Sequence, residues 1–400
     1  MLKGETAKPE HTKFGPGVVR DKFIGLFGKS PLLFRSPGRI NLIGEHTDYN
    51  EGFVMPAAID REMIFAISAS TGEQASLHSL KHDQTITFDI GNPARLKAPM
   101  WANYMLGVVR RYADKGHTIG PFNCVVDGDI PTGAGLSSSA ALECGFAFAL
   151  NALFDLKVEK IEMVHIAQWA EHHYVGVMCG IMDQFASMMG AADKAFVLDC
   201  RSLSYQYFSL DLRDYTIVLC DTLVKHSLEG TEYNTRRAEC ESGVRILKRY
   251  YPEIKSLRDV TIEMLQKHRG EFEGKIFDRC KYVVEENQRV LAAADDLAHG
   301  NLKSFGDKMY GSHEGLSKLY EVSCPELDFL VDIARKFPDV IGSRMMGGGF
   351  GGCTINIVAK IRVADFVKVA AEAYKNRFNT NMEHYVVALR PGTSAVTDVT

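Results

Sequence analysis

The chain has 400 residues, of which 46% are hydrophobic and 24% are charged, and its formal net charge is −4. This length allows two domains or one large domain, and this composition is that of a folded globular protein rather than a disordered one. A slightly acidic balance argues against a general binder of nucleic acid or anionic membranes, because such proteins present a basic face.

No segment is typical of secretion or of a membrane span. Residues 1–20 are expected to form a loosely held arm, and their scattered charges do not fit a signal peptide. The most apolar window, Ala140–Phe154, contains Glu143 and is shorter than the roughly 20 residues that cross a bilayer. The nine cysteines are odd in number and contain no C-x-x-C pair, so we expect reduced thiols and a cytoplasmic protein.

A dense polar segment follows the first predicted elements, a short amphipathic helix around Val19–Phe27 and a strand beginning at Leu32. No single helix or strand face would use so many polar groups, whereas convergence on a polyhydroxylated ligand would. A surface turn with local hydrogen bonds is the alternative, above all for residues 48–50. The polar residues of this segment are Arg39, Asn41, Glu45, His46, Asp48, Tyr49 and Asn50.

Residues 53–126 alternate between strand-like and helix-like patterns. Strands are predicted at Met63–Ala69, Thr85–Phe88 and Phe122–Val126, with a helix at Trp101–Tyr112.

The glycine-rich segment 128–143 follows the last of these strands and leads into a helix-like run. Gly133 and Gly135 permit close backbone approach, and the serines at 137–139 stand where the helix would begin. Unpaired N–H groups, the helix dipole and serine hydroxyls all favour an anion, so we interpret the segment as a phosphate-binding loop. The alternative is an ordinary serine-capped helix after a glycine turn.

Two carboxylates stand out in the next segment. A helix is predicted over Val158–Val175, with Glu171 near its end. Asp183 lies among apolar residues and requires a ligand hydroxyl, a metal or an arginine as its partner, unless it only caps a helix. His165, His172 and His173 lack the H-E-x-x-H spacing of zinc sites, so no zinc is expected.

The second half of the chain is predicted to be rich in helices. Strands at Asp193–Cys200 and Tyr215–Cys220 flank a weak boundary near Leu210, which gives domains at 1–210 and 211–400. A charged helix opens near Tyr233 and reaches Tyr250, and further amphipathic helices follow to Lys336. The charge pattern favours a solvated face for Arg236 and Arg237.

Five glycines occur between positions 347 and 352, before a predicted strand at Thr354–Ala359 and a last amphipathic helix marked by apolar residues from Val363 to Tyr374. The glycines let backbone lie against something flat or against another loop; a flexible hairpin turn is the alternative.

The common nucleotide-binding motifs are absent. Gly28-Lys-Ser30 is the nearest match to a P-loop, but Phe23 stands at the place of its first glycine. Protein-kinase signatures are missing as well. Ser138 occupies the third glycine position of a dinucleotide fingerprint, which weakens that interpretation, although a hydroxyl suits a nucleotide bound with Mg²⁺.

Four motifs instead resemble those of one family. Pro131–Ala141 is similar to the ATP-binding motif of the GHMP small-molecule kinases, and Gly347–Gly352 to their third motif. Gly38–Asn50 resembles the signature of the galactokinases within that superfamily, and Cys179–Phe185 the segment that holds their aspartate. The only visible departure is Glu51, where many relatives have a different small or polar residue.

The resemblance implies an α+β, two-domain GHMP kinase fold with the active site in the cleft between the domains. It implies ATP and galactose as substrates, Mg²⁺ as cofactor, and galactose 1-phosphate, the first committed product of the Leloir pathway, as product. By motif match, the catalytic pair is Arg39 and Asp183; the sugar-binding residues are Glu45, His46, Asp48, Gly180 and Tyr233; the ATP-binding residues are Gly133, Ala134, Gly135, Leu136, Ser137, Ser138 and Ser139; and the metal ligands are Ser139 and Glu171.

Arg39 and Mg²⁺ would neutralise charge during phosphoryl transfer. Asp183 would accept the proton of the C1 hydroxyl or orient that hydroxyl. Asp48 is the main candidate for recognising the axial C4 hydroxyl. We expect a monomer. Two alternatives stay open: an N-acetylgalactosamine or other sugar 1-kinase, and a sensor that binds galactose and ATP without turnover.

Overall fold

The computed structural model describes residues 14–210, 212–224 and 229–397. The first helix, α1 (Pro16–Phe27), begins three residues before the predicted Val19, with proline in its first turn, where no N–H is needed. Residues 16–20 therefore belong to a helix and not to the expected arm, whose residues 1–13 lie outside the described part. Among the described residues, no helix is long and apolar enough to cross a membrane.

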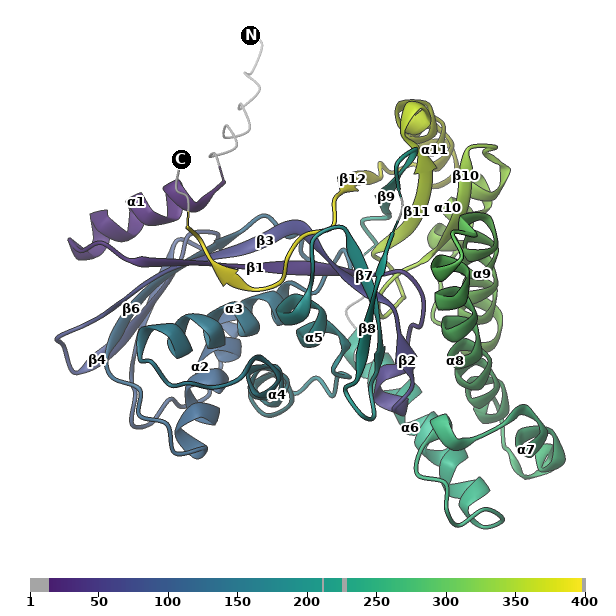
Figure 1. Ribbon diagram of the computed structural model, residues 1–400, viewed down its shortest axis with the longest axis horizontal. Coiled ribbons are helices and arrows are strands. Elements are labelled where there is room, and N and C mark those ends of the chain that lie inside the picture. Colours follow the sequence, from purple (N-terminus) through teal and green to yellow (C-terminus); the bar gives the residue numbers. More distant parts are fainter. Residues whose placement is uncertain (1–13, 211, 225–228, 398–400) are drawn as a thin grey trace, which may run out of the picture.

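A six-stranded sheet forms the framework of the N-terminal half, and α1 covers one of its faces (Figure 1). The second face carries α2 to α5. All neighbouring strands pair antiparallel except β4 and β6, which are parallel. In spatial order the strands are β13 (Ser394–Ala395), β1 (Leu32–Asn41), β3 (Pro56–Ala69), β6 (Phe122–Gly128), β4 (Gln74–Ser79) and β5 (Gln84–Asp89).

The helices on the second face enclose the largest apolar core. α3 packs on β1 and β3, and its buried residues include Phe146 and Leu150. These helices are α2 (Met100–Asp114), α3 (Ser138–Leu153), α4 (Lys160–Ala170), the π-helical turn η2 (Glu171–Val175) and α5 (Met182–Met189). Most of the apolar window from Ala140 onward is buried here, within α3.

A bulge in β1 brings the sheet against the glycine-rich loop. The register with β3 shifts between Pro37 and Arg39, with Gly38 at the irregularity. A Cβ at Gly38 would stand 2.7 Å from the carbonyl oxygen of Leu136, closer than real Cβ contacts allow. Glycine at this position therefore lets the strand touch the loop, and it places Arg39 directly beside it.

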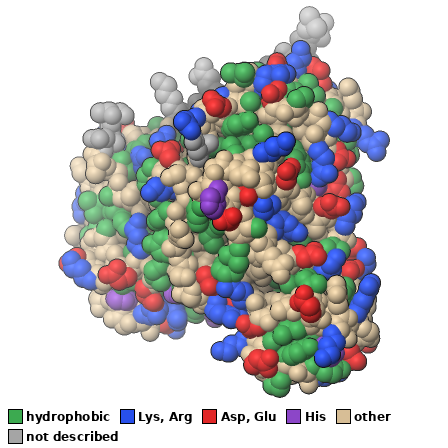
Figure 2. All heavy atoms as spheres, turned by 45° about the vertical axis from the view of Figure 1, so that its right-hand side comes forward, with side chains coloured by type: hydrophobic (Ala, Val, Ile, Leu, Met, Phe, Trp, Pro, Cys, Tyr) green, Lys and Arg blue, Asp and Glu red, His purple; other side chains and the backbone are tan. Residues whose placement is uncertain are grey.

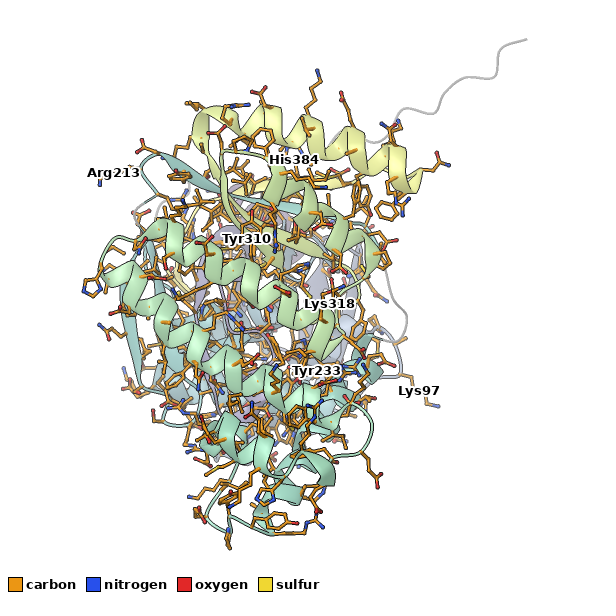
Figure 3. The ribbon with its side chains drawn as sticks, turned by 90° about the vertical axis from the view of Figure 1, so that its right-hand side faces the viewer. Lys97, Arg213, Tyr233, Tyr310, Lys318 and His384 are labelled. Carbon is orange, nitrogen blue, oxygen red and sulfur yellow. The ribbon has the colours of Figure 1, made fainter. Side chains whose placement is uncertain are left out.

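The C-terminal half contains a four-stranded sheet covered by a layer of helices, which faces the viewer in Figure 3. Its strands, in spatial order, are β10 (Val340–Met345), β11 (Cys353–Ala359), β9 (Tyr215–Asp221) and β12 (Glu383–Val387). The longer helices are α6 (Glu229–Lys248), α8 (Ile276–Ala298), α9 (Leu302–Gly315), α10 (Pro325–Lys336) and α11 (Val363–Phe378). Short turns of helix are α7 (Ile262–Lys267), η3 (Leu257–Asp259), η4 (Arg269–Glu271), η5 (Leu316–Tyr320) and η6 (Lys360–Arg362).

A small three-stranded sheet stands between the two larger ones. It consists of β2 (Phe53–Val54), β7 (Lys194–Asp199) and β8 (Tyr205–Ser209). Near the end of the chain, β13 leaves the C-terminal half and pairs with β1, as the yellow strand in Figure 1 shows. The two halves are thus joined by chain crossings at both ends of the second half.

Most predicted elements are confirmed, with shifted ends. The predicted helix 158–175 is divided, since α4 ends at Ala170 and a π-helical turn follows. Several short strands, among them β8 and β13, were not predicted. The surface in Figure 2 carries basic and acidic side chains interspersed over the visible face.

Two glycines in helices provide a test of the packing. Gly145 of α3 faces Phe65 and Ser36, and a Cβ there would collide with the Phe65 ring, whereas Gly25 of α1 has open space. We expect Gly145→Ala to lower the free energy of unfolding by about 1–3 kcal/mol through overpacking. Gly25→Ala should raise it by up to ~1 kcal/mol, because alanine favours a helix. Urea unfolding of both variants measures this; equal effects would contradict the packing of α3.

Candidate active site

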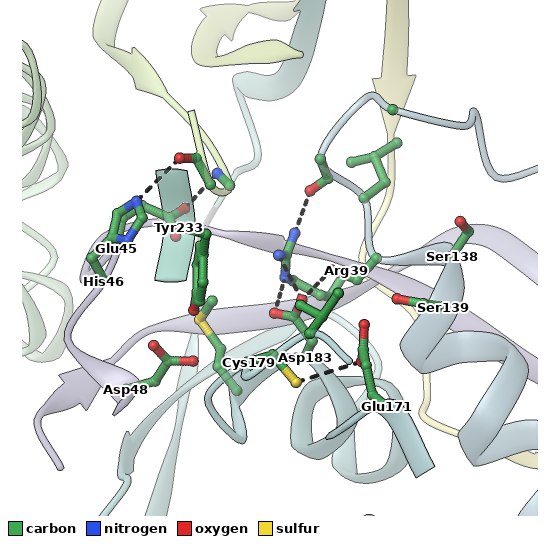
Figure 4. Close-up of a pocket in the computed structure, with 18 of the residues that line it drawn as sticks. Arg39, Glu45, His46, Asp48, Ser138, Ser139, Glu171, Cys179, Asp183 and Tyr233 are labelled. Carbon is green, nitrogen blue, oxygen red and sulfur yellow. Dashed lines mark hydrogen bonds and ion pairs between the residues drawn. The ribbon is translucent and has the colours of Figure 1, made fainter. Parts of the chain in front are cut away.

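The predicted functional residues converge on one cavity of about 230 Å³ between the two halves (Figure 4). Among the residues predicted for the site, Ala134 and Gly180 do not line its wall. Its lining residues are Arg39, Glu45, His46, Asp48, Pro131, Gly133, Gly135, Leu136, Ser137, Ser138, Ser139, Glu171, Val177, Cys179, Met182, Asp183, Tyr233, Gly347 and Gly348.

Arg39 and Asp183 form a bidentate ion pair at the centre of the cavity. Arg39 Nε donates to Asp183 Oδ1 at 2.8 Å and Nη2 donates to Oδ2 at 3.1 Å. Burial lowers the pKa of Arg39, but the charges of Asp183 and Glu45 outweigh it and the net shift is upward. Asp183 lies in the first turn of α5, whose N-cap is Ile181, so it is paired with arginine and is not a helix cap.

Glu45 is fixed by an arginine that the sequence did not reveal. Arg344 of β10 is fully buried, and its Nη2 donates to Glu45 Oε1 at 2.9 Å. The same oxygen accepts the backbone N–H of Gly347 at 2.8 Å, which leaves Oε2 for a ligand. Arg344 also donates to the carbonyl oxygens of Asn41, Leu42 and Met345.

His46 is held as a neutral ring in one tautomer. Its Nε2 lies 3.3 Å from the carbonyl oxygen of Gly348, which can only accept, so Nε2 carries the hydrogen. Nδ1 therefore accepts from the hydroxyl of Tyr49 at 2.8 Å. Burial lowers the pKa of His46 to about 4. Because both ring nitrogens are engaged, His46 shapes the cavity wall beside Tyr233, whose ring centroid is 5.4 Å away.

Asp48 lines the cavity on the same side as Glu45 and His46 (Figure 4). Its Oδ1 accepts from the N–H of Tyr49 at 2.9 Å. Burial, together with the charge of Asp183, raises the pKa of Asp48 to about 7. A Cβ at Gly180 would overlap this carboxylate, so glycine at 180 is what allows Asp48 to lie where it does.

The glycine-rich loop 133–137 and the loop 347–352 pack backbone against backbone. Gly133 and Gly135 have φ values of 82° and 73°, which favour glycine. A Cβ at Gly347 would lie 3.3 Å from Gly135 Cα, and one at Gly352 would lie 3.3 Å from the carbonyl oxygen of Gly133. The prediction that the second glycine cluster lies against another loop is thus confirmed.

Glu171 and Ser139, the two predicted metal ligands, both line the cavity. Burial raises the pKa of Glu171 to about 7. Gln184 Nε2 donates to Glu171 Oε2 at 2.7 Å and also to the fully buried Glu143. A hydroxyl and a carboxylate suit Mg²⁺, which takes few protein ligands when phosphates supply others. Among the described residues, no group of three or more His, Cys, Asp or Glu could hold a metal by itself.

A second cavity of about 250 Å³ adjoins the first, and the two share Ser138 and Ser139. The aromatic rings of Trp101 and Tyr104 line it, together with apolar side chains such as Leu142. Trp101 and Tyr104 lie in the predicted helix Trp101–Tyr112. Their sequence pattern does not indicate a cavity, because an aromatic pair in a helix is ordinarily part of the core.

Arg236 and two histidines form hydrogen bonds with backbone carbonyl oxygens. Arg236 is buried, and it donates to the carbonyl oxygens of Tyr320 and Glu321, so the predicted solvated face is wrong for this residue. His172 and His173 each pair with a backbone carbonyl, of Cys179 and Trp169 respectively.

Removing Arg344 tests the support of Glu45. Arg344→Met leaves a buried carboxylate without its charged partner and three backbone carbonyls without their arginine donor, and we expect a loss of about 3–5 kcal/mol in the free energy of unfolding. Arg362→Met removes a half-exposed arginine paired with Asp339 and should cost less than about 1 kcal/mol. Denaturant unfolding compares the two; similar losses would contradict the structural role of Arg344.

The carboxylate of Asp48 should make stability depend on pH. Its pKa rises from 3.8 to about 7 on folding, so the folded state holds the proton more tightly and loses stability as pH rises through this interval. Asp48→Asn should therefore stabilise the ligand-free protein at pH 8 by on the order of 3 kcal/mol, and this gain should shrink toward pH 4. Urea unfolding from pH 4 to 8 measures it, and Glu171 titrates equally in both proteins. A gain independent of pH would contradict the burial of Asp48.

Family models match three stretches of the chain, and relatives match most of its length. The model "Galactokinase galactose-binding signature" matches residues 21–69, "GHMP kinases N terminal domain" matches 103–191, and "GHMP kinases C terminal" matches 293–376. The galactokinase of Roseiflexus sp. is 40% identical over 96% of this chain and 97% of its own length. That of Thermotoga maritima is 40% identical over 90% of this chain and 99% of its own length.

Solved structures agree. The crystal structure of Lactococcus lactis galactokinase complexed with galactose superposes with a TM-score of 0.91 at 35% identity, covering 95% of this chain and 99% of that one. Methanococcus jannaschii mevalonate kinase shares the fold, with a TM-score of 0.65 at 16% identity over 90% of this chain and 98% of that one. At this identity and coverage, the chain belongs to the galactokinase family of the GHMP kinases.

Proposed function

We propose that this protein transfers the γ-phosphoryl group of ATP to the C1 hydroxyl of α-D-galactose, giving galactose 1-phosphate and ADP. The observation that carries the proposal is the position of the Arg39–Asp183 pair. It lies in one cavity with the polyol-facing carboxylates of Glu45 and Asp48 and with the serines of the phosphate loop. A donor and an acceptor bound on these two sides would meet at this pair.

The sugar is proposed to lie between Asp48, Glu45 and Tyr233. Carboxylate oxygens accept from hydroxyl groups, and a polyol presents several such donors in fixed directions. A site built around one hydroxyl leaves buried polar groups unpaired when an epimer binds, so Asp48 is the proposed reader of the axial C4 hydroxyl. Glu45 Oε2 and the ring of Tyr233 complete this side, while His46 holds the wall.

ATP is proposed to bind across the two adjoining cavities. The adenine ring would enter the second cavity beside Trp101 and Tyr104, since an apolar, aromatic-lined space suits a flat base. The phosphates would pass Ser138 and Ser139, which both cavities share, and meet the backbone of Gly133–Ser137 at the start of α3.

Ser139 and Glu171 would hold Mg²⁺, which in kinases neutralises phosphate charge and aligns the transferred group. The cavity contains the carboxylates of Glu45, Asp48, Glu171 and Asp183 against one lining arginine, Arg39. An unaccompanied polyphosphate would meet strong repulsion there. Gln184 keeps Glu171 in place from behind.

In the proposed reaction, galactose O1 bonds to the γ-phosphorus while the bond to the bridging oxygen breaks, and ADP leaves with that electron pair. Asp183 takes the O1 proton, and Arg39 offers positive charge to the moving phosphoryl group. Both oxygens of Asp183 already accept hydrogen bonds, which makes it a poor base, so the proton is expected to move late.

The proposal also covers the domain boundary, the cellular location and the oligomeric state. We place the domains at 1–210 and 211–400, with β13 returning to the first sheet. All nine cysteines are unpaired, which supports a reducing, cytoplasmic location. A monomer, without nucleic-acid or membrane partners, is proposed as well.

A coupled assay of ADP release tests the function. With Mg²⁺ we expect turnover of galactose, and a kcat/KM for glucose lower by at least about a hundredfold, because glucose differs at C4. N-acetylgalactosamine and arabinose complete the panel and define the tolerance at C2 and C6. Omission of Mg²⁺ with EDTA should abolish turnover. ADP release with none of these sugars would refute a sugar kinase.

A further inference from the structure

The three serines at the start of α3 are not equivalent in the structure. Ser137 is the N-cap residue of α3, and serine at this position ordinarily accepts a hydrogen bond from the first helical N–H groups. The Ser137 side chain makes no such bond. Its φ of 57° and ψ of 53° place it in the left-handed region, which is unfavourable for serine. At Ser137, therefore, α3 lacks a side-chain cap and the backbone is strained.

The side chain of Ser137 is directed to Asp183 instead. Ser137 Oγ donates to Asp183 Oδ2 at 2.6 Å, a short distance typical of a hydroxyl bonded to a carboxylate. The paired carboxylate can only accept, so the hydroxyl must be the donor. A serine hydroxyl has one hydrogen. While it is donated to Asp183, the Ser137 side chain cannot donate to a phosphate oxygen, although its backbone N–H is free to do so.

The neighbouring loop residues contact the other half of the pair. Arg39 Nη1 donates to the carbonyl oxygen of Gly135, and the backbone N–H of Arg39 donates to that of Leu136 at 3.2 Å. Three successive residues, Gly135 to Ser137, therefore contact the Arg39–Asp183 pair. The conformation of the phosphate loop and the orientation of Asp183 depend on each other.

We propose that Ser137 is a positioning residue for Asp183 and that its hydroxyl does not bind the phosphates of ATP. The kinetic consequence of this inference rests on the proposed function. The inference gives Ser137 a different role from Ser138 and Ser139, which are proposed to meet the phosphates. With the hydroxyl in place, Asp183 is held from two sides, by Arg39 and by the loop. Without it, Oδ2 keeps only the longer contact with Arg39 Nη2, at 3.1 Å.

The test compares Ser137→Gly with Ser138→Ala. Glycine tolerates the left-handed backbone, so Ser137→Gly should fold, as circular dichroism and thermal unfolding can verify. We expect kcat to fall about tenfold, as for loss of a hydrogen bond to a charged group, while the KM values for ATP and galactose stay within about twofold. Ser138→Ala should instead raise the KM for ATP. An increase in the ATP KM of Ser137→Gly at unchanged kcat would identify Ser137 as a phosphate ligand and overturn the proposal, and so would unaltered kinetics.

A crystal structure of ligand-free Ser137→Gly provides a readout independent of turnover. We expect the Asp183 carboxylate to rotate or to show two conformers, and wild-type placement in a single conformer would overturn the proposal. If the wild-type protein released no ADP with any sugar, the proposed function would fail, and this structural comparison would still decide the role of Ser137. Binding of Mg·ADP by calorimetry should have the same Kd in wild type and Ser137→Gly; a weaker Kd would contradict the inference.

Discussion

The ion pair between Arg39 and Asp183 is the contact on which the rest of the site depends, because β1, α5 and the phosphate loop meet at it. Arg39 comes from the bulged end of β1, and Asp183 comes from the first turn of α5. The phosphate loop contacts both members, through Gly135 and Ser137. A partly buried pair is costly to desolvate, and it persists here because Arg39 also donates to the carbonyl oxygen of Gly135 and Ser137 donates to Asp183.

A second buried arginine gives the sugar side its rigidity. Arg344 joins β10 to the end of β1 and to Glu45, and Gly347 adds a backbone donor to the same carboxylate. The loop 347–352 thereby lies between the polar segment after β1 and the phosphate loop. Its backbone bonds to the side chains of Glu45 and His46 on one side and packs against the backbone of the phosphate loop on the other. The proposed sugar side and the proposed nucleotide side therefore share one support, which suits a reaction that depends on alignment more than on covalent chemistry.

The residues that line the cavity could be predicted because they are crowded along short stretches of sequence. So many polar groups near Glu45, or small residues near Gly133, have few structural explanations. The residues that hold these side chains in place could not be predicted. Arg344 stands in an apolar strand, and its partner Glu45 is 299 positions away, so only the fold reveals the pair. Which serine turns toward Asp183 depends on the left-handed backbone of Ser137, which local sequence does not determine. The general course of helices and strands followed from periodicity; β8 and β13 are too short or too dependent on their partners to show it.

The central claim is that Asp183, held by Arg39, handles the proton of the attacking hydroxyl. Single-turnover transfer by Asp183→Asn measures this most directly, with galactose affinity determined by calorimetry and folding by circular dichroism. The account predicts a transfer rate lower by about a hundredfold or more, with galactose still bound and the fold intact. A folded Asp183→Asn variant that transfers the phosphoryl group at nearly the wild-type rate would contradict it.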